Sequence, residues 1–476
     1  MSLSYKVFSI KNNFITYTFL EKMKLNYSSA NILFELRQSL KLVIPLIGTQ
    51  LFYAVGNIGS TIILAHVGAG ELATNALVWG IYITLILFVM GMLSSVCALV
   101  AQKHGARDKQ GINIIINQGF LLVIVLAIPI SLIIWLIPTI VSWTNQDPII
   151  IKLAKPYCHS LILSILPLNL LLIIEQILIG MSAVRTVFLL SGLKVILELF
   201  FVYVLVFGKY GFSKLGLVGI GYGISIAASC TLIIAICSIY YSKKWDGYCW
   251  RLSLSQCSFK RFWGLIKQGF PLGAMCCIEL SLFSTAAFMM SHFGIFLLAA
   301  HQFVYQCLVF TLTIIFGVLQ ATTVRIGNEV GNNNFSQLKL IVWINLGIGF
   351  CVILPLVMLY FFFPQYLAAF GFGTQALENQ LVIKYIKKFL PLIAVLQIVE
   401  GVRLIVIGAL RGLNDTKVIM YNSILAFWIV AFPISYLLAF VLHWGGAGIW
   451  LGLLMGIMVG AIVSLTRFNF LVNNSS

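Results

Sequence analysis

Four glutamates lie inside long apolar stretches of this sequence: Glu175, Glu198, Glu279 and Glu400. A carboxylate at the centre of a lipid bilayer costs about 2.5–3.5 kcal/mol even on a lenient insertion scale. Four such groups facing lipid would cost roughly 10 kcal/mol, which is comparable to the whole stability of a typical domain. The four carboxylates must therefore face a protein interior or a wet cavity, where a carboxylate can bind a proton or a dehydrated cation.

Helical spacing separates these glutamates by their local partners. Glu198 lies four residues after Lys194, and Glu400 lies three residues before Arg403, so each pair shares one helix face. For both glutamates, one interpretation is an internal ion pair that makes a buried charge tolerable, and the other is a functional site. Glu175 lies nearer the end of its apolar stretch and could simply reach water.

Glu279 differs from the other three because no basic residue lies within a helical turn of it. A desolvated carboxylate without a cationic partner can gain and lose a proton near neutral pH, and it can equally bind a dehydrated cation. We therefore predict that Glu279 is unpaired and that it is the best candidate of the four for binding a coupling ion.

Uncharged polar side chains recur at helical spacing in two further apolar stretches. They are Gln50, Tyr53 and Asn57 in one stretch, and Gln302, Tyr305 and Gln306 in the other. Polar residues supply interhelical hydrogen bonds in any membrane bundle, so each of them has a purely structural interpretation. The functional interpretation is a substrate cavity, and we predict that Gln50, Tyr53, Asn57, Gln302 and Tyr305 line it together with Glu198.

The elements that position these residues follow from composition. The chain has 476 residues, of which 61% are hydrophobic and 9% charged, and its mean hydropathy is +1.04. Twelve stretches reach the roughly 20 apolar residues that span a bilayer. They are residues 41–65, 73–99, 113–137, 157–181, 186–207, 217–241, 268–291, 296–322, 339–363, 389–410, 418–441 and 446–468. The predicted fold class is an all-α polytopic membrane protein with twelve transmembrane helices.

The second half of the chain repeats the first. At an offset of 226 residues Pro45 recurs as Pro271, Leu72-Ala73 as Leu298-Ala299, Gly91 as Gly317, and Gly105 as Gly331. Further along, the offset becomes 232, since Gly180 pairs with Gly412. Six spans in each copy keep the two copies in the same orientation, which is the build of a secondary transporter. By this repeat, Glu279 occupies the position of Tyr53, so the ionisable group is present in the second copy only.

The repeat defines the expected domains. We expect a cytoplasmic tail over residues 1–37, a six-helix bundle over 38–241, a cytoplasmic link over 242–267, a second six-helix bundle over 268–468 and a tail over 469–476. The link joins two pseudo-symmetric bundles that can rock against each other.

The net charge of +17 has a topological origin. With the N-terminus inside, twenty-one Lys and Arg residues fall on the cytoplasmic side and seven on the other. The positive-inside rule then places both termini in the cytoplasm, and we expect the cytoplasmic (inner) membrane as the location. The basic residues therefore do not indicate nucleic-acid binding.

Residues 1–37 lack a secretory signal, and Met23 is an alternative start.

Neither cysteines nor histidines form a catalytic or metal-binding pattern. The ten cysteines contain no CxxC motif, and the six histidines are scattered along the chain. We therefore expect a protein that is not an enzyme, with no metal site and no cofactor beyond a coupling ion.

An ordered set of short motifs resembles the multidrug and toxic compound extrusion (MATE) family, particularly its NorM-like and eukaryotic branches. The resemblance covers about residues 35–468 and rests on segments at matching spans. They are Pro45 with Gln50, Ala101-Gln102-Lys103-His104-Gly105-Ala106, Pro271 with Glu279, Arg325-Ile326-Gly327-Asn328-Glu329-Val330-Gly331, Glu400 before Leu410-Arg411-Gly412, Phe427-Trp428 and Pro433-Ile434-Ser435-Tyr436.

The resemblance implies an antiporter that exports amphipathic, usually cationic, compounds in exchange for H⁺ or Na⁺. In that family the acids that match Glu279 and Glu400 bind the coupling ion. Asp415, which follows the Arg411-Gly412 signature, is a weaker candidate for the same role, and its alternative is an ordinary loop aspartate. We expect small organic cations as substrates, the lipid bilayer as the surroundings, and a monomer.

The first half departs from the family pattern at three positions. Many bacterial members carry an aspartate where this chain has Ser60, which puts a coupling scheme through that residue in doubt. Glu198 stands near a usual amide, and Glu175 near a usual arginine. We therefore expect a more anionic cavity, with Lys194 cancelling part of the charge.

Other functions fit less well. A flippase for a lipid-linked oligosaccharide carries pyrophosphate and needs several intramembrane cations, whereas only Lys194 and Arg403 lie within the predicted spans, each beside a glutamate. A channel needs a ring of polar groups from repeated subunits, which two copies with unequal acids do not supply.

Overall fold

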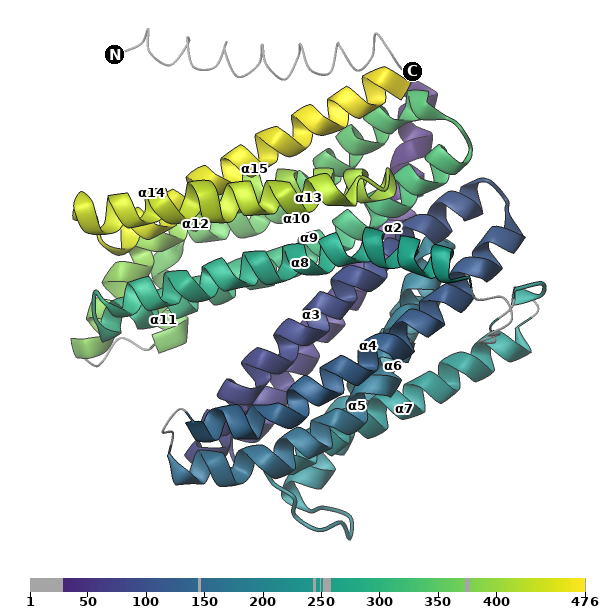
Figure 1. Cartoon of the computed structure of the whole chain (residues 1–476). Helices are drawn as coiled ribbons and strands as arrows, with labels where there is room; N and C mark the ends of the chain where they lie inside the picture. Colours follow the sequence, from purple (N-terminus) through teal and green to yellow (C-terminus); the bar gives the residue numbers. More distant parts are fainter. Residues whose placement is uncertain are drawn as a thin grey trace, which may run out of the picture.

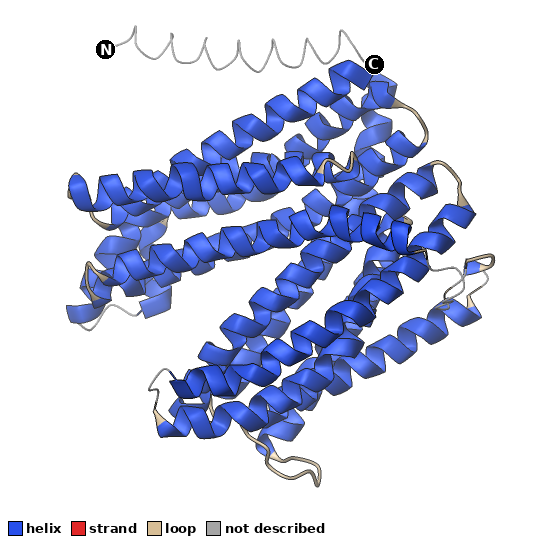
Figure 2. Cartoon of the chain, viewed as in Figure 1, coloured by secondary structure: helices blue, strands red, loops and turns tan. Residues whose placement is uncertain are grey.

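The computed structural model describes residues 29–143, 147–242, 245–248, 250, 258–372 and 377–475, and its regular elements are helices (Figure 2). Several predictions concern residues outside this part. These are the basic tail before Ser29 with the alternative start Met23, and Lys243, Lys244 and Arg251 in the link.

Twelve helical spans in the described residues are long and apolar enough to cross a membrane, which confirms the predicted fold class. The first bundle contains α2 (Ser29–Ala65), α3 (Ala69–Gly105), α4 (Lys109–Trp143), α5 (Pro148–Gly180), α6 (Val184–Phe207) and α7 (Leu217–Tyr241). The second contains α8 (Phe259–Ser291), α9 (Ile295–Gly331), η3 (Phe335–Gln337), α10 (Leu338–Phe362), α11 (Pro364–Phe372), α12 (Leu377–Gly412), α13 (Thr416–Ser423), η4 (Ile424–Ala431), α14 (Phe432–Tyr436), η5 (Leu437–Val441) and α15 (Gly446–Ser475).

The helices are longer than the apolar stretches that predict them. α2, α3 and α9 have 37 residues each, or roughly 55 Å at about 1.5 Å per residue, compared with a hydrocarbon core of about 30 Å. Residues 29–37, expected in the tail, and residues 259–267, expected in the link, are helical instead. An apolar stretch ends at the first charged residue, but a helix continues because its backbone hydrogen bonds remain satisfied and long charged side chains reach water.

The two bundles meet mainly along four helices, with α10 also packing against α2, and they diverge at one end. α3 packs against α8 and α9, and α2 packs against α9, so each bundle contributes its first two helices to the interface. Figure 1 shows that the bundles converge near the start of α8 and separate toward the C-terminal ends of α2 and α8.

The repeated glycines lie at the closest approach between the bundles. A Cβ added to Gly91 would lie 2.7 Å from the Leu272 carbonyl oxygen, and one added to Gly317 would lie 2.7 Å from the Ile47 backbone nitrogen. Leu272 and Ile47 come from the equivalent parts of α8 and α2, so the two contacts are related by the repeat. Small residues allow membrane helices to approach this closely. The spacing that reveals the repeat in the sequence therefore marks the bundle interface in the structure.

Candidate functional site

A buried cluster of two carboxylates and one guanidinium occupies the second bundle. Arg403 on α12 donates to both oxygens of Glu400, from Nε to Oε2 at 2.7 Å and from Nη2 to Oε1 at 2.6 Å. Its third contact runs from Nη1 to Glu279 Oε1 on α8 at 2.9 Å. Arg403 is fully buried and Glu400 is 4% exposed. The cluster thus holds one positive and two negative formal charges.

The prediction of an unpaired Glu279 is wrong. Its cationic partner, Arg403, lies 124 residues away in the sequence and on a different helix. Reasoning from helical spacing finds partners on the same helix only, and for that reason it detected the Glu400–Arg403 pair and missed the second contact. Glu279 is nevertheless the more accessible of the two acids, because its side chain is 16% exposed and that of Glu400 is 5% exposed.

The eleventh span supplies further contacts to this cluster. Ser423 Oγ donates to Glu279 Oε1 at 3.0 Å. Beyond Ser423 the chain forms the π-helical stretch η4, which places the Phe427 ring 5.0 Å from the Arg403 guanidinium carbon. Irregular π-helical turns inside α-helical spans often occur at functional sites. The sequence signal for Ser423 was available, since an offset of 232 makes it the repeat partner of Ser191.

Aromatic rings connect the charged cluster to one of the predicted cavity residues. The Phe283 ring lies 6.2 Å from Phe427 and 5.2 Å from Tyr305, measured between ring centroids. Gln302, one helical turn before Tyr305 on α9, is exposed. Residues from α8, α9 and η4 therefore combine an apolar aromatic surface with the ion cluster.

A second group of ionisable side chains lies in the first bundle. Tyr53 on α2 donates its hydroxyl to Glu175 on α5, with distances of 2.8 and 2.9 Å to the two carboxylate oxygens. Lys194 pairs with Glu198 at 3.0 Å, as their spacing predicted, and Lys194 Nζ lies 5.2 Å from the Tyr53 ring centroid. Glu175 is 3% exposed, so the idea that it simply reaches water is wrong. Its partners come from other helices, which its own sequence neighbourhood could not reveal.

The remaining predicted cavity residues lie at different depths. Gln50 is buried on α2, one turn before Tyr53, whereas Asn57 is exposed two turns further along that helix. Asn57 lines a cavity of about 450 Å³ together with Asn75 on α3 and Gln306 on α9. Both bundles therefore contribute polar side chains to this cavity.

Asp415 is engaged elsewhere. Its carboxylate accepts a hydrogen bond from Arg467 Nε on α15 at 2.7 Å, and its described contacts include neither Glu279 nor Glu400. The structure therefore does not bring this third candidate into the cluster.

Comparison with known proteins assigns the chain to a family. The MatE family model matches residues 45–204 and 271–437, which include most of both bundles. The chain belongs to the MATE family. A probable multidrug resistance protein NorM of Rhizobium meliloti (strain 1021) is 28% identical over 443 residues, covering 91% of this chain and 92% of that protein. A probable multidrug resistance protein NorM of Synechocystis sp. is 27% identical over 435 residues, covering 91% of this chain and 94% of that protein.

Solved structures of the MATE family share the fold. The eukaryotic MATE transporter AtDTX14 matches with a TM-score of 0.81 at 19% identity, over 94% of this chain and 99% of that one. An outward-facing conformation of a multidrug resistance MATE family transporter of the MOP superfamily matches with a TM-score of 0.82 at 18% identity, over 93% and 97% of the two chains. The present chain is thus an integral membrane transporter.

Polar contacts between the bundles close this MATE transporter at the end where α2 and α8 begin. Arg325 on α9 donates to Glu35 on α2 from Nε at 2.9 Å and from Nη2 at 2.5 Å, and it also pairs with Glu329 at 3.1 Å. Nearby, Asn414 Nδ2 donates to Gln102 Oε1 on α3 at 2.8 Å. We call these five residues the polar gate. Sequence reasoning missed it because Glu35 lies in the expected tail.

At the opposite end the MATE bundles diverge (Figure 1), and the cavity of about 450 Å³ lined by Asn57 and Gln306 lies there. Ile58 and Ile62 near the end of α2 are 54% and 55% exposed, and Phe288 near the end of α8 is 77% exposed. No group of three or more His, Cys, Asp or Glu side chains within the described ranges is arranged to hold a metal ion. The chemistry of the interior thus rests on carboxylates, hydroxyls, the paired cations Lys194 and Arg403, and the buried Arg411 on α12, whose Nη2 lies 3.9 Å from Met275 Sδ.

Proposed function

We propose that this chain is an antiporter that exports amphipathic organic cations in exchange for H⁺ or Na⁺. The cluster of Glu279, Glu400 and Arg403 carries the proposal. Two carboxylates share one guanidinium, so the cluster keeps a formal charge of −1 in a region that the bilayer desolvates. Either a substrate cation or a coupling ion neutralises that charge, and the two compete for it.

Competition for one charge provides the coupling. A ligand shifts an equilibrium between two conformations only as far as it binds one of them better. Deprotonated Glu279, the more accessible acid, attracts a cationic substrate in one conformation. A proton or Na⁺ arriving from the other side neutralises the carboxylate, displaces the substrate and favours the return. The coupling free energy is reciprocal, so substrate binding weakens ion binding by the same factor.

The arrangement of the bundles supplies alternating access. The polar gate closes one end of the bundle interface and exposed side chains line the other, as expected for one of two states that rocking would interconvert. We place the closed end in the cytoplasm, together with both chain termini, on the basis of the charge asymmetry, and we place the protein in the cytoplasmic (inner) membrane. In this orientation the conformation faces outward.

Two surfaces support the proposal of a cationic substrate. Phe283, Phe427 and Tyr305 present aromatic rings beside the acidic cluster, and ring faces attract organic cations. In the first bundle, Lys194 pairs with Glu198, while the Tyr53 hydroxyl binds Glu175. Each of the two ion clusters, counted without the separate buried Arg411, thus has an excess of negative charge.

The same charges argue against a flippase for a pyrophosphate-linked substrate. Lys194 and Arg403 already pair with carboxylates at 3.0 Å and 2.6 Å. Because one chain contains both bundles and both groups of acids, we propose that the monomer is the transporting unit.

Substrate-dependent efflux from inverted membrane vesicles tests the proposal. Proton and sodium gradients are imposed separately, with ethidium or tetraphenylphosphonium as the probe. We expect one gradient to drive uptake into the vesicles and Glu279→Gln to abolish it at unchanged membrane expression. Glu71→Gln, in the first turn of α3 and outside the cluster, is the matched control and keeps wild-type transport. Coupled transport retained by Glu279→Gln would contradict the assignment.

A further inference from the structure

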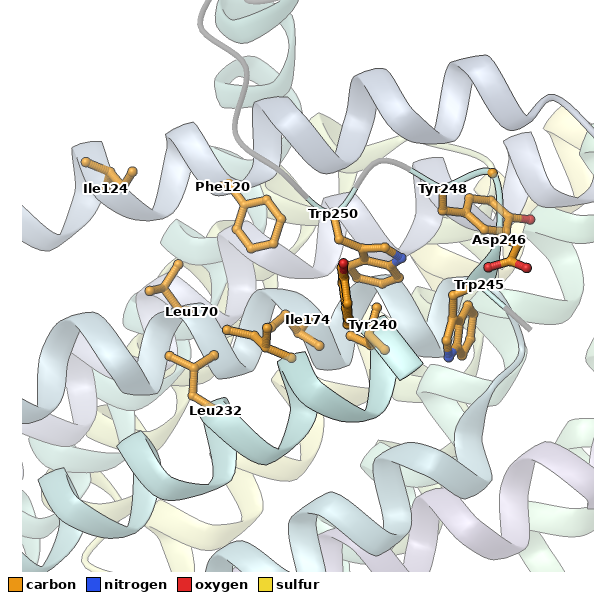
Figure 3. A pocket seen from close by; sticks show the side chains of 13 residues that line it. Phe120, Ile124, Leu170, Ile174, Leu232, Tyr240, Trp245, Asp246, Tyr248 and Trp250 are labelled. Atoms are coloured by element: carbon orange, nitrogen blue, oxygen red, sulfur yellow. The ribbon is translucent and has the colours of Figure 1, made fainter. Parts of the chain in front are cut away.

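A cavity of about 580 Å³ lies outside the bundle interface, on the flank of the first bundle. α4, α5 and α7 form its walls, and residues 245–248 and 250 of the link cover one end of it (Figure 3). Neither the acidic cluster nor the polar gate belongs to it. The transport mechanism proposed above therefore leaves this cavity without a role.

The covered end of the cavity carries a carboxylate among aromatic rings. Asp246 is exposed, and no hydrogen bond or ion pair with a described residue engages its carboxylate. Figure 3 shows Asp246 at the same end of the cavity as Trp245, Tyr248 and Trp250. The Trp245 ring lies 5.9 Å from Trp250 and 6.4 Å from Tyr248, at steep angles of 83° and 64°. A carboxylate close to aromatic rings is a combination that recognises an ammonium group.

A positive charge and a hydrogen-bond donor without a described acceptor lie at the same end of the cavity. The Lys109 ammonium, at the exposed start of α4, lies 5.7 Å from the centroid of the Tyr248 ring. The buried Trp250 Nε1–H has no hydrogen-bond acceptor among the described residues. A buried donor without an acceptor is costly. The end of the cavity thus offers groups for an anion next to groups for an ammonium.

The rest of the cavity is apolar and faces the bilayer. Phe120 and Ile124 on α4 and Leu232 and Ile236 on α7 line it, and Ile124 and Ile236 are 38% and 51% exposed. α7 ends at Tyr241, so the aromatic cluster follows directly after the membrane span. Trp and Tyr concentrate at this depth, where the headgroups of the lipids lie. An acyl chain therefore fits the apolar part while its headgroup reaches the aromatic end.

We propose that this cavity binds one zwitterionic phospholipid with an ethanolamine or choline headgroup. Asp246 and the surrounding rings take the ammonium, Lys109 and the Trp250 N–H take the phosphate, and the apolar part takes an acyl chain. An anionic lipid without an ammonium leaves Asp246 unpaired and facing a like charge. A lipophilic cation without a phosphate leaves the Lys109 side unused. The zwitterion satisfies both groups.

The position of the cavity suggests what the lipid does. Residues 245–248 and 250 belong to the link between α7 and α8, so a lipid bound there holds this part of the link against the first bundle while the second bundle moves. This role concerns the link and is independent of which ion or substrate the transporter uses.

Native mass spectrometry of the purified full-length protein tests the site. The protein is titrated with phosphatidylethanolamine, phosphatidylcholine and phosphatidylglycerol of identical acyl chains. We expect retention of one ethanolamine or choline lipid over phosphatidylglycerol, and loss of about tenfold in affinity in Asp246→Asn and in Lys109→Gln, the size of a lost charged contact. Asp147→Asn and Lys41→Gln, which change the same charges elsewhere, retain the lipid.

The outcomes separate the alternatives. Equal retention of phosphatidylglycerol, or wild-type lipid affinity in both Asp246→Asn and Lys109→Gln, would overturn the proposal. Displacement of the lipid by low concentrations of tetraphenylphosphonium would show that the cavity is a site for lipophilic cations instead. Binding is measured in Glu279→Gln as well. Unchanged lipid retention there separates this proposal from the proposed function, because that variant tests transport alone.

Discussion

Each bundle places a serine beside the equivalent position of its first helix, but the residue that the serine contacts differs between the bundles. Ser191 Oγ lies 3.3 Å from the Tyr53 hydroxyl in the first bundle, and Ser423 Oγ lies 3.0 Å from the Glu279 carboxylate in the second. Tyr53 and Glu279 are repeat partners at an offset of 226 residues, and the serines are partners at 232. The duplicated fold therefore conserves the contact and changes its chemistry from a phenol to an acid.

Both groups carry the same formal charge but distribute it differently. Each contains two glutamates and one cation, giving −1. In the first bundle, Lys194 pairs with Glu198 while hydroxyl groups bind Glu175. In the second, a single fully buried arginine binds both acids. A change at one acid of the second bundle is thus transmitted to the other through Arg403, which suits a site that exchanges charge.

Removing the shared cation is expected to have the largest effect. Arg403→Gln leaves two neighbouring buried carboxylates without a counter-charge and should destabilise the protein by about 3–5 kcal/mol. Thermal unfolding in detergent measures this loss. Lys194→Gln should cost less, because only one acid loses its partner and Lys194 is 12% exposed.

Combining Arg403→Gln with Glu279→Gln and Glu400→Gln provides the control. Removing all three charges together should restore much of the lost stability, since no charge of the cluster is then left without its partner. If Arg403→Gln alone unfolds at the wild-type temperature, the electrostatic account of the cluster is incorrect.

Exchanging the repeat partners tests which bundle couples the ion. Glu279→Gln should reduce coupled transport to background, whereas Tyr53→Phe removes one hydroxyl donor to Glu175 and should reduce it by roughly tenfold at most. Initial rates of gradient-driven uptake into inverted vesicles give both values. A Tyr53→Phe variant as inactive as Glu279→Gln would place essential coupling in the first bundle as well.

Opening the polar gate should change how the bundles meet without touching either acidic group. Glu35→Gln removes the charge that holds Arg325 across the interface. We expect roughly tenfold faster alkylation of Cys97, which is buried on α3 at the closed end, because a hydrogen bond between charged groups contributes about 1.5–3 kcal/mol.

Cys158, buried within the first bundle, is the internal control for that measurement. Its labelling should stay at the wild-type rate, as measured by mass spectrometry of the same digests. Faster labelling of both cysteines would indicate general loosening and contradict a specific gate.

The serine pair offers the smallest expected difference. Ser423→Ala removes a hydrogen bond to a charged carboxylate and should weaken coupling-ion affinity by about tenfold. Ser191→Ala removes a longer hydrogen bond to Glu175, at 3.4 Å, and a contact with the Tyr53 hydroxyl at 3.3 Å, and it should change this affinity by roughly threefold or less. The concentration of coupling ion at half-maximal transport measures both. Equal effects of the two substitutions would remove the functional asymmetry inferred from the repeat.

Local patterns predicted a large part of the molecule. Apolar stretches near 20 residues located the twelve spans, because the bilayer imposes that length on any helix that crosses it. Spacings of three and four residues predicted the Lys194–Glu198 and Glu400–Arg403 pairs, since such residues share a helix face. The repeat placed Tyr53 and Glu279 at equivalent positions.

The sequence by itself thus determined the membrane-spanning architecture, the duplication and the short-range ion pairs. The tertiary structure alone decided that Arg403 also binds Glu279, that Tyr53 binds Glu175, and that Glu35 meets Arg325. These contacts join residues 122 to 290 positions apart in the chain. Helical periodicity predicts which residues are neighbours on one helix. Helix packing decides which helix faces come into contact, and the charge balance of this transporter depends on these interhelical contacts.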